Sequence, residues 1–569
     1  MSDGHSPLLL FRCEVQELMA LTETRPDDTA SDEALSPTQS VAGGLLGTAD
    51  HVAVGRAWVA AGSVFLLGGL VAGLLAAVEH ADTGGFDLVN NANTFTQLWS
   101  AGRVFLLLGG VLPILVGLAT SIVPLQVGSA GLAFARGAAA AFWTWLLSIG
   151  VVILAYAFDG GPAGGDTDFV VLWALGLVLV GVSLLWAMVT IATTVLGARA
   201  EGMTLERVPV ATWGFFVFSV GGLLTLPVMI AELVMAYLDT KYGYLPTAES
   251  RAGLVGVVNT LSIAPALYWV AVPTLGLAVE AIGVHTGRAI RFHKTILALI
   301  GLLGFVAYGA DVYSFSSRGR SIALDNGLMV VAILATAVVM LAILAAAGDS
   351  VKGGKPKLTT PLLAGLVSGL LLVLGAIVAE LAQIDPVVNF INKNFDASIN
   401  LDDALMLNGT SFHEGLRGFI LGAAIVGIIG GVEHFAHKVW GRTMNGGLGA
   451  ISVLAGAAGT LVWGVGGVGA GFAGQPMLPA VESGVDSTIE AFNVASLIGL
   501  GLLVAGVGIF VLNIFVSLIG RRGAGTEPWR GVTLEWATDS PPRRGNFATA
   551  PVVTSATPLA DNSTDGEDA

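Results

Sequence analysis

Residues 104–127 read VFLLLGGVLPILVGLATSIVPLQV, a run that contains no charged side chain. Wound into an α-helix, a run of this length crosses about 30 Å of hydrocarbon. The whole chain has the same character, because 54% of its 569 residues are hydrophobic, 12% are charged and the mean hydropathy is +0.79. Soluble domains carry about 25% charged residues. The composition therefore excludes a soluble enzyme and predicts an all-α integral membrane protein.

This run is one of twelve apolar segments that are each long enough to span a bilayer as a helix. The segments lie at 57–78, 104–127, 138–158, 169–197, 208–238, 253–284, 295–315, 326–347, 360–384, 411–437, 445–472 and 491–520. We therefore expect a twelve-helix membrane domain at 56–520. Polar composition predicts a disordered N-terminal segment at 1–55 and a disordered C-terminal tail at 521–569. Because Met19 begins the run MALTETRPDD, it is an alternative start to Met1, which N-terminal sequencing would decide.

The charges of the loops predict the orientation of the bundle. If the N-terminus is cytoplasmic, the inside loops hold most of the Lys and Arg residues, and the outside loops hold most of the loop Asp residues. The positive-inside rule therefore places both termini in the cytoplasm, in a prokaryotic plasma membrane. The net charge of −15 lies mainly in the tails and loops, so the expected partner is the lipid bilayer and not a nucleic acid.

Glycine is frequent in the predicted spans, as it is where membrane helices approach closely. Gly69 and Gly73 lie one turn apart in the first span, and GVGGVGAGFAG occupies 464–474. We predict that these residues form helix-packing surfaces.

The sequence contains few cysteine and histidine residues that could ligate a metal. The single cysteine, Cys13, excludes a disulfide framework and any Cys-based metal or iron–sulfur site. Eight histidines leave haem or copper ligation open by number. The weak ligand candidates are those that touch a predicted span, His413, His434 and His437, all near the ends of the tenth one. His434 and His437 share a helix face, which suits either a metal pair or interfacial polar residues.

A few polar side chains lie at predicted membrane depth, where ionisable groups are costly and often functional. The candidates are Glu232, Asp311, Arg417 and the hydroxyl group of Tyr268. Buried structural hydrogen bonds or ion pairs are the alternative interpretation. A proton or ion path would need a chain of such groups across the bilayer, and the sequence does not supply one.

Several segments resemble subunit I of the haem-copper oxidases, the cytochrome c oxidase type, which is a twelve-helix membrane protein with cytoplasmic termini. The similar segments are PLQVGSAGLAFARGAAAAFW at 124–143, RAEGMTLERVPVATW at 199–213, LPV at 226–228 and HFAHKVWGR at 434–442. The resemblance covers the second to seventh spans well and the tenth moderately. It implies the oxidase bundle, with cytochrome c oxidation and O2 reduction as the family's activity.

The ligand positions that the resemblance implies do not carry histidine. In the second span the haem-ligand position is Gly102, with the family's proline in register at Pro113. In the sixth span the copper-ligand position is Ala264, although Tyr268 is kept. The adjacent histidine pair of the seventh span corresponds to Ala310 and Asp311. The pair of the tenth span corresponds to Leu416 and Gly418, or to Gly415 and Arg417.

The two proton-entry positions that the resemblance implies are also changed. The aspartate before the third span corresponds to Gly131, and the eighth span contains no lysine. Because Ala, Gly and Leu cannot ligate iron or copper, the resemblance implies a scaffold without a catalytic centre.

These observations lead to three hypotheses. The first is a pseudo-enzyme that binds no haem or copper and serves as a structural or assembly subunit of a respiratory or other membrane complex. The second is an active terminal oxidase subunit, in which haem and copper would need substitute ligands such as His413. The third is a transporter, or a lipid- or quinone-binding protein, that uses the same bundle with Glu232 and Asp311 at the midplane.

Overall fold

The computed structural model describes residues 48–81, 89, 92–162, 164–243, 254–258, 265–315, 322–381, 407, 409–478, 486–519, 529 and 531–560. The chain divides into two units, Met1–Gly47 and Thr48–Ala569. The first unit, and with it most of the predicted N-terminal segment, lies outside the described residues. So do the side chains of 265–268, 308–315 and 322–335, which include Tyr268 and Asp311.

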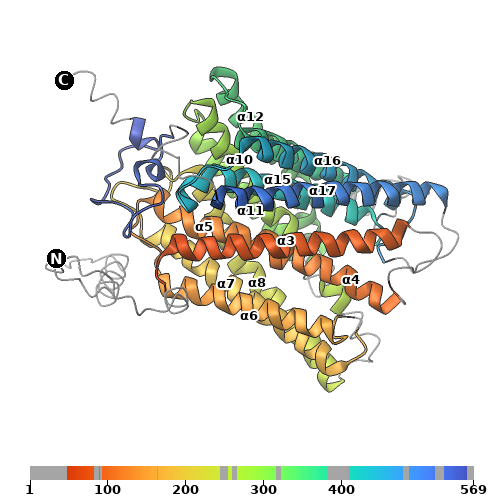
Figure 1. Ribbon diagram of the computed structural model, residues 1–569. Coiled ribbons are helices and arrows are strands. Elements are labelled where there is room, and N and C mark those ends of the chain that lie inside the picture. The colour runs from red at the N-terminus through yellow and green to blue at the C-terminus, as the bar shows by residue number, and fades with distance from the viewer. Residues whose placement is uncertain are drawn as a thin grey trace, which may run out of the picture. The chain divides into compact units, whose positions relative to one another are not determined.

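The second unit is a bundle of long helices (Figure 1). Its helices are α3 (His51–Ala81), α4 (Ala92–Val104), the π-helix η1 (Phe105–Val111), α5 (Leu112–Val127), α6 (Ala135–Ala157), α7 (Thr167–Gly197), α8 (Val210–Tyr242), α10 (Pro265–Thr286), α11 (His293–Phe315), α12 (Ile322–Gly353), α13 (Thr360–Leu381), α15 (Phe412–Trp440), α16 (Gly446–Phe472) and α17 (Ser487–Ile519). Because α4, η1 and α5 are continuous, the described residues form twelve helical rods, as predicted. Ten of them are long and apolar enough to cross a membrane. The prediction of an all-α membrane bundle is confirmed.

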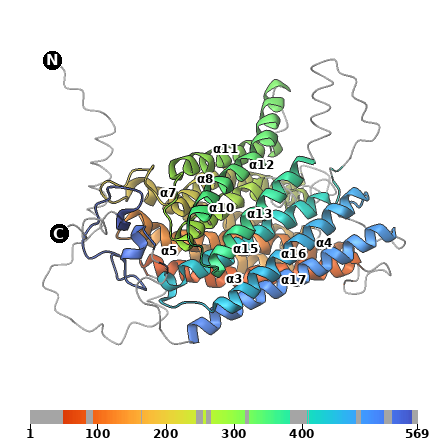
Figure 2. The ribbon, with the colours of Figure 1, turned by 90° about the horizontal axis from the view of Figure 1, so that it is seen from above.

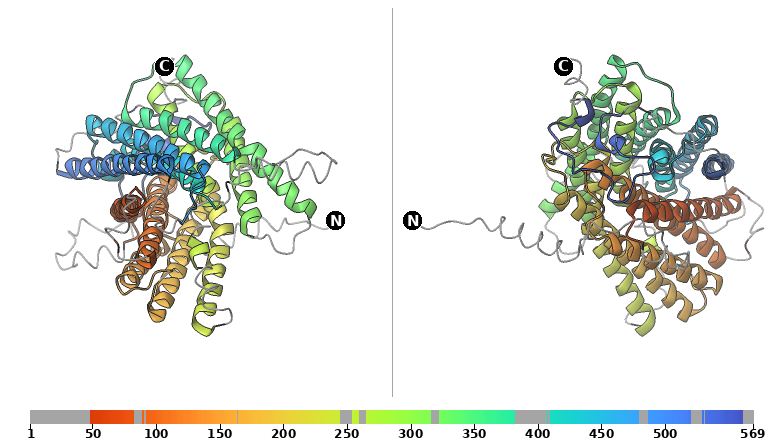
Figure 3. Two further views of the ribbon diagram at one scale, coloured as in Figure 1. Left: turned by 90° about the vertical axis from the view of Figure 1, so that its right-hand side faces the viewer. Right: turned by 60° about the vertical axis from the view of Figure 1, so that its left-hand side comes forward.

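The outer surface of the bundle is apolar, as in a membrane protein. Large apolar side chains such as Leu147, Phe305 and Phe515 are more than half exposed on the helix surfaces. Soluble proteins rarely expose so much apolar surface, whereas lipid covers it without cost. Viewed along the bundle, the last helix, α17, lies beside the first, α3, and both views in Figure 3 agree on this.

The second rod changes its helical geometry in the middle. Pro113 has no backbone N–H, and its ring would collide with the carbonyl group one turn earlier in a regular α-helix. The seven residues Phe105–Val111 form a π-helix directly before it. Such widened turns commonly relieve a proline in a helix.

Glycine allows backbone contact between neighbouring rods. A Cβ atom built at Gly69 of α3 would lie 2.4 Å from the backbone nitrogen of Leu106 in η1. One built at Gly102 of α4 would lie 3.0 Å from the backbone nitrogen of Gly73 in α3. In α16, Cβ atoms at Gly467 and Gly471 would lie 2.4 Å and 2.2 Å from the backbone of the residues opposite them in or beside α15. The predicted packing role is confirmed for Gly69, Gly467 and Gly471, whereas a Cβ atom at Gly73 would meet nothing within 4 Å.

The C-terminal tail packs against one end of the bundle, where α5, α15 and α17 end (Figures 1 and 2). We call this the tail end, and the opposite end, where α3 ends and α15 begins, the far end. Trp536, in the 3-10 turn Leu534–Ala537, is buried and stacks on the His437 ring with centroids 4.9 Å apart. Lys438 donates to the Thr538 carbonyl at 2.6 Å.

The prediction of a disordered tail at 521–569 is therefore wrong for residues 531–560. The prediction used the average polarity of the tail and did not consider its few apolar side chains. Of these, Leu534, Trp536 and Val553 are buried against other parts of the chain. The boundary at residue 55 is also wrong, because α3 already begins at His51. His51 is held there by the tail, since its Nε2 atom lies 2.9 Å from Oδ1 of Asn546.

A buried carboxyl group joins the tail to the helices. Gln126 of α5 and Thr533 both donate to Oε1 of Glu535, at 2.9 Å and 2.8 Å. The hydroxyl group of Thr212 in α8 donates to the Gln126 side chain at 2.5 Å. Burial raises the pKa of Glu535 above its ordinary value, because the charged form loses its hydration.

We predict that Gly69→Ala lowers the stability of the folded protein by about 1–3 kcal/mol, because its new methyl group would press on the backbone of η1. Gly68→Ala is the matched control, since a Cβ atom at Gly68 meets nothing within 4 Å. The thermal midpoint of each variant in detergent measures the effect. Equal midpoints for the two variants would contradict the inferred contact.

We predict that the contribution of Glu535 to tail binding is largest at low pH. Because the folded-state pKa of Glu535 is raised, the stability that this residue contributes is full below its unfolded pKa and is lost as the pH rises through the folded value. Glu535→Gln keeps an oxygen for both hydrogen bonds and should remove this pH dependence. Hydrogen-exchange protection factors of residues 531–560 across a pH series measure it.

The control for this experiment is Asp539→Asn, which changes a half-exposed tail carboxylate that pairs with Arg543. Its protection factors should follow those of the unchanged protein. If Glu535→Gln also follows them, Glu535 does not govern the binding of the tail.

Candidate functional site

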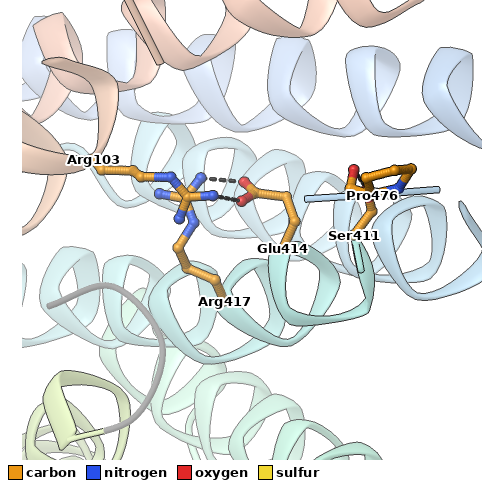
Figure 4. A network of polar contacts seen from close by, with 5 residues as sticks. All are labelled: Arg103, Ser411, Glu414, Arg417 and Pro476. Carbon is orange, nitrogen blue, oxygen red and sulfur yellow. Dashed lines mark hydrogen bonds and ion pairs between the residues drawn. The ribbon is translucent and has the colours of Figure 1, made fainter. Parts of the chain in front are cut away.

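A cluster of two arginines and one glutamate lies inside the bundle towards the far end (Figure 4). Arg103 comes from α4, and Glu414 and Arg417 lie one turn apart on α15. Each arginine donates through Nη2 to a different carboxylate oxygen of Glu414. The side chains of Arg103, Arg417 and Glu414 are 2%, 8% and 24% exposed. The cluster thus places two cations and one anion in the interior of the protein.

Two tryptophans support the guanidinium groups. The Cζ atom of Arg103 lies 3.9 Å from the ring centroid of Trp99, and that of Arg417 lies 5.2 Å from the ring centroid of Trp463. Both distances are within the range of a cation–π contact. The aromatic rings therefore help to hold the two guanidinium groups in place.

Arg103 and Arg417 are among the residues that line a cavity of about 60 Å³. Arg103 Nε, Arg103 Nη1 and Arg417 Nε are buried and have no hydrogen-bond partner in the described structure. Residues of α3, α4, α15, α16 and α17 line the cavity, and many of them are small. One imidazole, that of His80 at the end of α3, also lines it.

Part of this cluster was predictable. Arg417 was a candidate as an ionisable residue in the tenth span, and the structure places it in the cluster. Glu414 was not identified, although its spacing of i, i+3 from Arg417 is a pattern that favours ion pairs on a helix. No sequence signal indicates that Arg103, 311 residues away, meets Glu414.

The positions that correspond to family ligands carry no ligating side chain where the structure describes them. Gly102 is packed against the backbone of Gly73, Leu416 is a buried apolar residue of α15, and Gly418 lies under the ring of Trp463. Ala264 lies outside the described residues, as do the side chains of Ala310 and Asp311.

The three histidines of α15 lie at opposite ends of the helix. His413 is at the far end, and His434 and His437 are at the tail end. A separation of 21 residues between His413 and His434 corresponds to about 32 Å along a helix. The three imidazoles therefore cannot share one site. In the described residues, no group of three or more His, Cys, Asp or Glu residues is arranged to hold a metal ion.

Sequence reasoning also missed a pairing at the tail end. His285 of α10 and His434 lie close together, with Nε2 of His285 3.0 Å from Nδ1 of His434. The Trp529 indole donates to the His434 carbonyl at 3.2 Å, and its ring lies against His285. Nδ1 of His285 in turn contacts the Thr359 hydroxyl group at 2.9 Å. These contacts make His434 part of the tail interface.

Of the other polar residues predicted at membrane depth, only Glu232 has a described side chain. Glu232 is half-buried on α8 and makes no ion pair with a described residue. The side chains of Tyr268 and Asp311 lie outside the described residues, so no path through them can be traced.

Comparisons with known proteins agree on one family. The sequence pattern of the family described as "Cytochrome C and Quinol oxidase polypeptide I" matches residues 53–397. Cytochrome c oxidase subunit 1 of Thermostichus vulcanus is 26% identical over 533 residues, which cover 89% of this chain and 90% of the relative. A putative cytochrome c oxidase subunit 1-beta of Streptomyces avermitilis is 26% identical, with 91% of each chain covered.

A solved structure supports the fold. It is described as a cryo-EM structure of a heme-copper terminal oxidase dimer and superposes with a TM-score of 0.61 at 12% identity, covering 83% of this chain and 85% of that one. The family match spans more than half of the chain and the relatives span nearly all of it. On this evidence the chain belongs to the cytochrome c and quinol oxidase polypeptide I family, the subunit I family of the haem-copper oxidases.

Proposed function

We propose that this chain is a subunit I-type membrane protein that has lost haem and copper binding and serves as a structural or assembly subunit of a membrane complex. The observation that carries the proposal is the contact at Gly102. A haem-ligand histidine is implied there by the family resemblance, but a Cβ atom would lie 3.0 Å from the backbone of Gly73. Any side chain at this position would be tightly packed against the backbone of α3.

The surroundings of Gly102 do not fit a haem either. The cavity of about 60 Å³ beside it has room for about four water molecules, far less than a porphyrin ring needs. Its polar lining is dominated by two arginines, which cannot ligate iron because they stay protonated. His80 is the one imidazole at its wall, and a second axial imidazole is lacking there among the described residues.

An active oxidase subunit is not favoured by these observations. It would need substitute ligands, and the candidates His413, His434 and His437 are spread over both ends of α15. His434 and His437 are also enclosed by Trp529 and Trp536 of the tail.

A structural role is supported by the integrity of the bundle. Helix packing through glycine is tight around the position of Gly102, so the fold does not depend on a cofactor to fill its interior. The apolar outer surface suits the lipid bilayer and other membrane subunits. The bacterial relatives favour a plasma-membrane location.

The orientation is part of the proposal. We propose that the tail end faces the cytoplasm, because cations cluster in its short connections and helix ends. They include Arg136, Arg199, Arg207, Arg288, Arg291, Lys294, Lys352, Lys355 and Lys357.

We predict that the full chain, purified from its own membranes, shows no stoichiometric Soret band and no stoichiometric copper. Absorption spectroscopy and elemental analysis of the same sample measure this. As a control, a portion supplied with free haem before purification should emerge with the same spectrum. A Soret band equivalent to one haem per chain would overturn the proposal.

The proposed role as a subunit is tested by co-elution with other membrane proteins. In mildly solubilised membranes the chain should elute with other membrane subunits in a fixed ratio, and not as a free monomer. Elution as a monomer under conditions that preserve the host's respiratory complexes would count against a role as a subunit.

A further inference from the structure

The cavity beside the Arg103–Glu414–Arg417 cluster has features that the proposed function does not use. We propose that it is a binding site for an anionic group, a carboxylate or a phosphate, held between Arg103 and Arg417. The group would come from a lipid headgroup or from a free anion, which share this chemistry. The proposal rests on the proposed function, because it needs the cavity between Gly102 and the arginines to hold no haem.

The charges of the cluster do not balance. Two guanidinium groups share one carboxylate, so the cluster carries a net charge of about +1 in the interior of an apolar bundle. An uncompensated charge away from water is costly, and breaking or leaving incomplete a buried ion pair typically costs several kcal/mol. A bound anion would complete the pairing of the second arginine.

Three N–H groups of the two arginines have no hydrogen-bond acceptor in the described structure. Arg103 and Arg417 are both more than nine-tenths buried, and Arg103 Nε, Arg103 Nη1 and Arg417 Nε lack partners in the described structure. Buried polar groups are normally hydrogen-bonded, so three unpaired N–H groups on two arginines that line the same cavity favour an acceptor there. Carboxylate and phosphate oxygens match the planar fork of arginine better than water does.

The cavity also offers space beside the guanidinium groups, because small residues of two helices, α3 and α16, make part of its walls. These residues are Gly69, Gly73, Ala76, Ala77, Gly467 and Ala470. A volume of about 60 Å³ suits a single carboxylate or phosphate group, together with a water molecule or two.

Glu414 gives the site a property that can be tested. Its carboxylate occupies one Nη2 group of each arginine and therefore competes with any incoming anion. Removing the charge of Glu414 should strengthen anion binding, whereas removing Arg417 should weaken it. A purely structural ion cluster would lose stability in both variants and would gain nothing from an added anion.

The experiment uses the full chain in zwitterionic phosphatidylcholine nanodiscs and follows its thermal midpoint. In one arm inorganic phosphate is titrated, and in the other phosphatidylglycerol replaces part of the phosphatidylcholine. We expect the unchanged protein to gain stability in at least one arm, by mass action. A gain with phosphate identifies a free anion, and a gain with phosphatidylglycerol alone identifies a lipid headgroup.

The variants decide the assignment. Glu414→Gln should bind the effective anion about tenfold more tightly, and Arg417→Gln about tenfold more weakly, since a hydrogen bond to a charged group is worth at least about 1.4 kcal/mol. Lys241→Gln, an exposed cation at the far end that pairs with Asp168, is the matched control and should behave like the unchanged protein.

If Arg417→Gln does not fold, the double variant Glu414→Gln/Arg417→Gln replaces it and should bind more weakly than Glu414→Gln alone. The proposal is overturned if neither anion stabilises the unchanged protein. It is also overturned if Glu414→Gln and Arg417→Gln shift the anion affinity in the same direction, or if Lys241→Gln matches Arg417→Gln.

Discussion

Glycine brings the helices of this bundle into backbone contact, since a Cβ atom at Gly69 would lie 2.4 Å from the Leu106 nitrogen and one at Gly499 would lie 2.2 Å from that of Trp463. Between helices in a membrane there is little hydrophobic driving force, so close packing must hold them together. The same close approach limits the space beside α4, and our proposal that the chain binds no haem rests on it.

The charged cluster depends on that packing as well. Arg103 follows Gly102 directly, so the contact of α4 with α3 also fixes where the Arg103 side chain enters the interior. From there it meets Glu414 on a helix that lies far away in the chain. Two cations around one carboxylate, with free N–H groups at a small cavity, form a site that favours an anion and disfavours a metal ion.

At the tail end, side chains of the C-terminal tail make the contacts described above. Tryptophan rings of the tail pack on His285, His434 and His437, and a buried hydrogen bond connects Glu535 to Gln126 of α5. The segment closes the ends of helices that would otherwise expose polar groups at the edge of the apolar region. In this way the two ends of α15 have separate roles, one in the charged cluster and one in holding the tail.

The sequence by itself determined the membrane class, the number of rods and the glycine packing surfaces, because hydrophobic length and small-residue spacing are local properties. That Gly102, Leu416 and Gly418 stand at ligand positions of the family is what the resemblance implies, and it stays a prediction. The tertiary structure alone decided that Arg103 meets Glu414, that His285 pairs with His434, and that residues 531–560 are packed and not disordered. Each of these depends on residues far apart in the chain, and local patterns carry no information about which helices become neighbours.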